Sequence, residues 1–204
     1  MTMMSATRSF SIDLPEGMAS IPVAAVPGTA RSLAATLAGT FGLPADDASA
    51  AVVADAFTVF GAMLGESGMD FAAMGLFRSP DDPDRPASVV VTGNRVPSDH
   101  ATPEVAIAGL RDLHAEQGAD PVETVALPAG PALVVVDETI QEMPTEDGVE
   151  SAVVVTRRAT AWIPDPAGTT IAVVSVMSPS WQDWAHTCEL ALDLFETFRW
   201  EAAR

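Results

Sequence analysis

The sequence predicts a single α+β domain over residues 1–204, in which a mainly antiparallel sheet is flanked by helices. Two observations carry this prediction. Four β-type stretches follow one another between residues 121 and 177, separated by turns rich in proline and glycine, and an amphipathic stretch then closes the chain. With 204 residues, 48% of them hydrophobic and 19% charged, the chain is long and apolar enough to fold around one sizeable core.

The N-terminal part predicts two short strands followed by two helices. Phe10, Ile12 and Leu14 alternate with polar residues, which is the pattern of a half-buried strand. The segments after them carry apolar residues at helical spacing and are bounded by proline and glycine. The predicted elements are strands at Arg8–Leu14 and Met18–Val23 and helices at Pro27–Gly42 and Pro44–Leu64.

A hairpin and a third helix are predicted next. Met69–Phe77 and Ala87–Thr92 are β-type stretches, and the segment Ser79–Pro86 between them is rich in proline and aspartate, as loops are. Thr102 precedes a proline and a glutamate, an order that favours a helix start because threonine caps free N–H groups. Gly118 is the predicted end of this helix.

The four C-terminal strands form a meander, so neighbouring strands should pair antiparallel. Val153–Val155 and Val173–Val176 are apolar at nearly every position, which is typical of strands covered on both faces. The predicted architecture is therefore an α/β/α or a two-layer sandwich. The strands are predicted at Pro121–Leu127, Ala132–Glu142, Glu150–Ile163 and Thr169–Met177.

The last segment, Ser178–Trp200, has the pattern of a long amphipathic helix packed on the sheet. Ser178 is its predicted N-cap, and Pro179 suits the first turn. Apolar residues recur at alternating spacings of three and four, which places them in one stripe. This stripe consists of Trp181, Trp184, Cys188, Ala191, Phe195 and Phe198.

The C-terminal part of the chain resembles a known group of proteins. Its strand, Pro164-Asp165-Pro166 turn, strand and closing helix, with Leu194-Phe195 and Phe198-Arg199-Trp200, look like those of uncharacterised actinobacterial proteins with a PsbP-like sandwich. Relatives of that architecture include LpqN-like lipoproteins and a Ran-binding import factor. The resemblance covers Ala119–Trp200, including Leu127-Pro128-Ala129-Gly130-Pro131, and it implies a binding or scaffold role without catalysis. The lipobox cysteine of the lipoproteins is missing near the start.

The net charge of the chain indicates which classes of partner it can bind. The chain has 28 acidic and 10 basic side chains, a net charge of −18, and every basic one is an arginine. Such a chain repels phosphate backbones and anionic lipids, so we expect neither a nucleic-acid nor a membrane partner. The acidity either serves solubility alone or forms the contact for a basic protein partner. The single cysteine and the absence of a signal peptide or a long apolar run lead us to expect a cytoplasmic location.

No motif for catalysis, metal binding or cofactor binding is recognisable. The histidines, His100, His114 and His186, are far apart and form no ligand pattern, and Asp81–Asp84 lacks the glycine and glutamate of a calcium loop. Without lysine the chain has no Schiff-base or P-loop chemistry, and without tyrosine no phenolic acid. We therefore expect no catalytic residue, no metal and no cofactor. Whether the protein is an enzyme stays open, and a non-enzymatic role is the favoured interpretation.

Four residues are candidates for ligand binding: Arg157, Arg158, Trp162 and Trp181. Neighbouring arginines in a strand point to opposite faces, so one of them should face helices or a pocket, where it could hold an anion or form a structural ion pair. Trp162 and Trp181 could line a binding surface if they met at an exposed end of the sheet. Two functions follow. The first is a non-enzymatic protein-binding or scaffold domain with an acidic surface. The second is a small-molecule or enzymatic domain that holds an anion between sheet and helices.

Overall fold

A computed structural model of the chain describes residues 8–21, 23, 61–118, 122–144 and 151–201, with the backbone alone at 141–144 and 151–154. The chain divides into two compact units: residues 14–95 form the smaller one, and residues 1–13 with 96–204 form the larger one. The predicted helix at 27–42 and most of that at 44–64 lie outside the described residues. Residues 61–66 are helical. The assignment of all 204 residues to one domain stays a prediction.

The smaller unit contains three antiparallel strands in the order β2-β3-β4. Their bounds are β2 (Met18–Ser20), β3 (Phe71–Arg78) and β4 (Pro86–Pro97). Ile21 and Ala72 form one cluster of buried residues in this unit, against which Leu64 and Met74 pack. The predicted hairpin is present, but β4 continues to Pro97, past the predicted end at Thr92, and its pairing with β3 extends to Gly93.

The larger unit is built on a meander of four strands in the order β8-β7-β6-β5, and all neighbouring pairs are antiparallel. Their bounds are β5 (Val122–Leu127), β6 (Gly130–Pro144), β7 (Ser151–Pro164) and β8 (Thr170–Ser178). The predicted α+β class with a mainly antiparallel sheet is confirmed in this coarse form. Leu127 pairs with Gly130 across a tight turn, where the positive φ of Gly130 (126°) is a conformation that glycine adopts easily.

Helix α3 (Pro103–Glu116) begins where the sequence predicts it. Thr102 is the N-cap, and its side-chain oxygen accepts a hydrogen bond from the Val105 N–H. A side-chain hydrogen bond with Thr102 is the main reason why the pKa of Glu104 lies below its ordinary value. The buried Ile107 packs on Leu133 of β6 and fixes the helix on the sheet.

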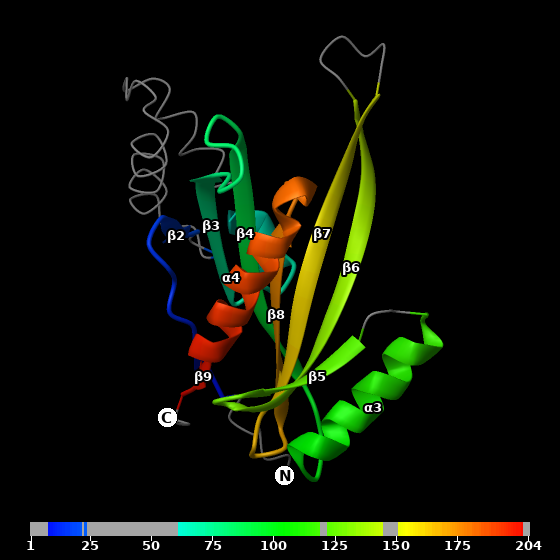
Figure 1. Ribbon diagram of the computed structural model, residues 1–204. Helices are drawn as coiled ribbons and strands as arrows, with labels where there is room; N and C mark the ends of the chain where they lie inside the picture. The colour runs from blue at the N-terminus through cyan, green and yellow to red at the C-terminus, as the bar shows by residue number, and fades with distance from the viewer. Residues whose placement is uncertain (1–7, 22, 24–60, 119–121, 145–150, 202–204) are drawn as a thin grey trace. The chain divides into compact units, whose positions relative to one another are not determined.

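Helix α4 (Trp184–Thr197) is shorter than the predicted helix at both ends (Figure 1). Ser178 does not cap it: this residue ends β8, and its hydroxyl accepts from the Ser180 N–H. A 3₁₀ turn, η1 (Trp181–Asp183), lies between β8 and α4, and Asp183 is the N-cap of α4. The turn leaves Trp181 outside the helix and 58% exposed, so the prediction that it belongs to the apolar stripe of the helix is wrong, whereas Phe195 of the same stripe is buried.

The helix also ends early, because Phe198 turns into extended backbone (φ −58°, ψ 136°). The next residues form β9 (Arg199–Trp200), which pairs antiparallel with β1 (Phe10–Ser11). Phe198 is fully buried, with its ring centroid 5.3 Å from that of Phe10 and 5.2 Å from that of Trp200. The contacts of these rings hold the two ends of the larger unit together.

Candidate functional site

Alternation along the strands gives the sheet of the larger unit two different faces. Val134 and Ala159 border a cavity beneath α4, whereas Leu133 and Val135 point the other way and contact Ile107 of α3. Helices α3 and α4 therefore pack on opposite faces of this sheet (Figure 1). Each helix leaves part of its face uncovered, and a cavity lies at each place.

The cavity under α4, which we call the α4 cavity, has a volume of about 210 Å³. Its lining comes from β5, β6, β7 and α4, and all of it is apolar except for one carboxylate and one thiol. This volume lies below the roughly 300–1,000 Å³ typical of pockets for drug-sized ligands, so the α4 cavity accommodates about one large side chain. The lining residues are Glu123, Val125, Val134, Val136, Ala159, Cys188, Ala191, Leu192 and Phe195.

Three acidic side chains lie at or near the outer edge of the α4 cavity. Leu192 belongs to its lining and is 47% exposed, so this residue marks the edge that faces solvent. Glu189 lies three residues before Leu192 and Glu196 four residues after it, which makes both its neighbours on the helix surface. Both are exposed, as is Glu123 on the sheet side. We call Glu123, Glu189 and Glu196 the acidic rim.

Cys188 lies inside the α4 cavity and is not set up as a nucleophile. Burial raises the pKa of its thiol, and the nearby positive charge of Arg157 offsets only part of that shift. Arg157 is itself paired, because its Nε lies 3.4 Å from Glu138 Oε2. A thiol with a raised pKa is mostly protonated at neutral pH, and the thiolate is the reactive form. The geometry thus favours a packing role for Cys188.

A second cavity, which we call the α3 groove, lies on the other face of the sheet and has a volume of about 150 Å³. Most of its lining side chains carry polar groups, in contrast to the α4 cavity. They come from the end of α3 and from β6, β7 and β8. The lining residues are His114, Val135, Asp137, Arg158, Thr160, Trp162, Val173 and Ser175.

The charged groups of the α3 groove neutralise each other. Arg158 donates two hydrogen bonds to Asp137, from Nε at 3.0 Å and from Nη2 at 2.7 Å. The two residues face each other directly across β6 and β7, and their side chains are 43% and 36% exposed. A forked pair of this kind has fixed geometry. An anion on Arg158 would have to compete with the Asp137 carboxylate.

The rest of the α3 groove consists of hydroxyl groups and rings. The Thr160 and Ser175 hydroxyls are buried and share a hydrogen bond of 2.9 Å. The His114 ring stands edge-on to Trp162, with 5.4 Å between centroids. His114 Nε2 is buried and has no hydrogen-bond partner among the residues that the structure describes, which costs about 1–3 kcal/mol.

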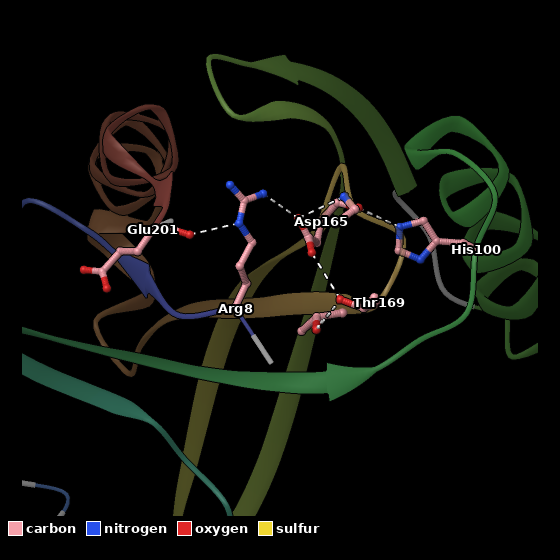
Figure 2. A network of polar contacts seen from close by, with 7 residues as sticks. Arg8, His100, Asp165, Thr169 and Glu201 are labelled. Atoms are coloured by element: carbon pink, nitrogen blue, oxygen red, sulfur yellow. Dashed lines mark hydrogen bonds and ion pairs between the residues drawn. The ribbon is translucent and has the colours of Figure 1, made fainter. Parts of the chain in front are cut away.

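A separate polar network surrounds Asp165 at the turn between β7 and β8 (Figure 2). The fully buried Asp165 carboxylate accepts hydrogen bonds from Arg8 Nη1 at 2.9 Å, from the Ala167 N–H and from the Thr169 hydroxyl. His100 Nε2 donates to the Asp165 carbonyl oxygen at 3.0 Å. Because these groups satisfy one another, we assign the network a structural role.

The four residues singled out from the sequence are divided between the two faces. Arg158 and Trp162 meet in the α3 groove, whereas Arg157 lies on the face of the α4 cavity. Trp181 lies in η1 and lines neither cavity, whereas Trp162 contacts His114 in the α3 groove. A common binding surface of Trp162 and Trp181 stays a prediction.

Sequence reasoning missed the other members of both sites. Asp137 and Glu138 gave no signal, because the register of β6 and β7 alone decides which acid meets which arginine. His114 was considered only as a metal ligand. Leu192 was not singled out, although its helical neighbours Glu189 and Glu196 could have indicated an apolar residue on an acidic surface.

Comparison with known proteins adds no relative. No protein family matches the chain, no curated protein matches it, and no solved structure matches it. The resemblance of Ala119–Trp200 to PsbP-like proteins stays a prediction. What defines the larger unit is an antiparallel sheet with one helix on each face and a cavity beneath each helix.

The described residues contain neither a membrane-spanning helix nor a cluster of metal ligands. No helix there is long and apolar enough to cross a membrane. No group of three or more His, Cys, Asp or Glu side chains in that part of the chain is placed to hold a metal ion. The expectation that the protein uses no cofactor stays a prediction.

Proposed function

We propose that the protein is a non-enzymatic protein-binding domain, and that a basic partner docks at the α4 cavity. The observation that carries this proposal is the combination of a half-open apolar cavity with an acidic rim. We further propose that the fold as a whole is an α/β/α sandwich of the PsbP-like kind and that the protein acts in the cytoplasm.

The α4 cavity can bind one anchoring side chain of the partner. Interfaces derive most of their binding free energy from a few side chains that fill well-packed pockets and lose their water. The α4 cavity presents Val134, Val136 and Phe195 to such a side chain. Leu192 extends the apolar surface outward to solvent. The expected anchor is one leucine, methionine or phenylalanine of the partner.

The negative charge of the acidic rim favours a positively charged partner. Glu123, Glu189 and Glu196 place negative charge on both sides of the opening, and the chain as a whole carries a net charge of −18. Opposite charge accelerates encounter and excludes acidic competitors. The occupant we propose is therefore a partner segment that carries an apolar side chain between arginine or lysine residues.

The experiment is a capture of partners from lysate at low and at moderate salt, with three forms of the full chain as bait. The forms are the unmodified chain, Glu189→Lys/Glu196→Lys in the acidic rim, and Asp112→Lys/Glu116→Lys on α3. Both double variants change the net charge equally, and all four positions are exposed. We expect a protein that binds the unmodified chain and the α3 variant, is captured about tenfold less by the rim variant, and dissociates as salt rises.

Two results would overturn the proposal. In one, the same proteins bind all three baits equally, which would make the contact nonspecific or place it elsewhere. In the other, nothing is captured at either salt concentration.

A small-molecule role is the second candidate, and the α3 groove favours it. Arg158 and Trp162, both singled out from the sequence for a ligand, lie together there. The anionic ligand expected from the sequence fits less well, because Nε and Nη2 of Arg158 already donate hydrogen bonds to the Asp137 carboxylate.

A further inference from the structure

We propose that the α3 groove binds a small uncharged molecule with several hydroxyl groups, such as a monosaccharide. This inference rests on the second candidate function and is independent of partner docking, because the groove lies on the opposite face of the sheet from the α4 cavity. Three properties of the groove carry it: its charge, its hydrogen-bonding groups and its size.

The charge of the groove favours an uncharged ligand. Arg158 donates to Asp137 from Nε at 3.0 Å and from Nη2 at 2.7 Å. The positive and the negative charge compensate each other, so the pair has no net charge. An anion would be repelled by the Asp137 carboxylate, and a cation by the Arg158 guanidinium. A neutral molecule approaches the pair without disturbing it.

The hydrogen-bonding groups of the groove suit hydroxyls. A hydroxyl both donates and accepts, a carboxylate only accepts and a guanidinium only donates. A ring of adjacent hydroxyls can therefore donate to Asp137 and accept from Arg158 at once, since these two side chains are bonded to each other and remain partly exposed. Thr160 and Ser175 add two further hydroxyls to the floor of the groove.

The rings and the volume limit the kind of molecule. Trp162 offers an aromatic surface with a polar N–H, suited to a ligand that has both C–H groups and hydroxyls. His114, edge-on at 5.4 Å, holds the Trp162 ring in place. The volume of about 150 Å³ leaves room for a single small ring.

The test follows the Trp162 indole N–H by nuclear magnetic resonance of the ¹⁵N-labelled full chain. The chain has four tryptophans, and Trp162→Phe identifies the signal. The probes are glucose, galactose, mannose and myo-inositol, with sodium phosphate and sodium acetate as anions. We expect a saturable shift with at least one of the polyols at a Kd of about 1–10 mM, the weak range for a few hydrogen bonds and one ring.

Two matched variants locate the binding. Asp137→Asn removes the carboxylate from the groove and frees the charge of Arg158, so polyol binding should weaken at least about fivefold while phosphate binding appears. Glu138→Gln makes the same kind of change at the neighbouring position, on the opposite face, and should leave polyol binding unchanged.

The proposal is overturned if none of the four polyols gives a saturable shift of the Trp162 signal. It is also overturned if phosphate or acetate binds the unmodified chain as tightly as any polyol, since the groove would then be an anion site. An equal loss of polyol binding in Asp137→Asn and Glu138→Gln would contradict it as well.

Discussion

Phe198→Ala should lower the free energy of unfolding of the larger unit by about 3–5 kcal/mol, the range for deleting a fully buried phenylalanine. The Phe198 side chain is 0% exposed and contacts the rings of Phe10 and Trp200. Its removal leaves a cavity at the place where β1 pairs with β9, and it loses contacts between aromatic rings as well. Urea unfolding followed by tryptophan fluorescence measures the change, because all four tryptophans belong to the larger unit.

Val105→Ala is the control for this measurement. Val105 lies in the same unit and is 56% exposed, so its truncation should change the free energy of unfolding by no more than about 0.5 kcal/mol. If Phe198→Ala had an effect as small as that of Val105→Ala, the β1–β9 contact would not contribute to the stability of the unit.

Arg8→Met should destabilise the larger unit by about 3 kcal/mol, the lower end of the range for leaving one partner of a buried ion pair alone. The Asp165 side chain is 0% exposed and that of Arg8 28%, so the carboxylate loses its cation at a buried position. The same urea experiment measures this change.

Asp165→Asn changes the other side of the same pair. Its amide oxygen can still accept a hydrogen bond from the Ala167 N–H, and the partly exposed Arg8 can turn toward water. We expect a loss of only about 1 kcal/mol, that of one net hydrogen bond. A larger loss from Asp165→Asn than from Arg8→Met would show that the pair is not held by the buried charge of Asp165.

Much of the fold could be predicted from local patterns. The turns of the C-terminal meander contain proline and glycine, and Thr102 marks the start of α3, so the strands and this helix were found close to their observed bounds. The end of α4 could not be found in this way. Phe198 continues the helical spacing, yet its backbone is extended and its ring stacks on Phe10, a contact with the other end of the chain that no local pattern records.

The candidate sites were less predictable than the fold. Alternation was enough to place Arg157 and Arg158 on opposite faces. The acidic partner of each arginine depends on which residue of β6 lies opposite it. The register between β6 and β7 decides this, and it is set by the pairing of the whole strands rather than by any single residue. The two cavities depend in addition on how far each helix covers the sheet, and no short pattern in the sequence records that.

The proposed docking surface can be tested most directly through Cys188, the single cysteine of the chain, because it lines the α4 cavity. The measurement is the rate of Cys188 alkylation by iodoacetamide at fixed pH, with and without a saturating amount of the captured partner. We expect the partner to slow alkylation at least about tenfold, because its anchor side chain fills the cavity. At the lowest partner concentration that saturates the unmodified chain, we expect most of this protection to be lost in Glu189→Lys/Glu196→Lys. Full binding with an unchanged rate of alkylation would show that the partner docks elsewhere and would contradict the proposed function.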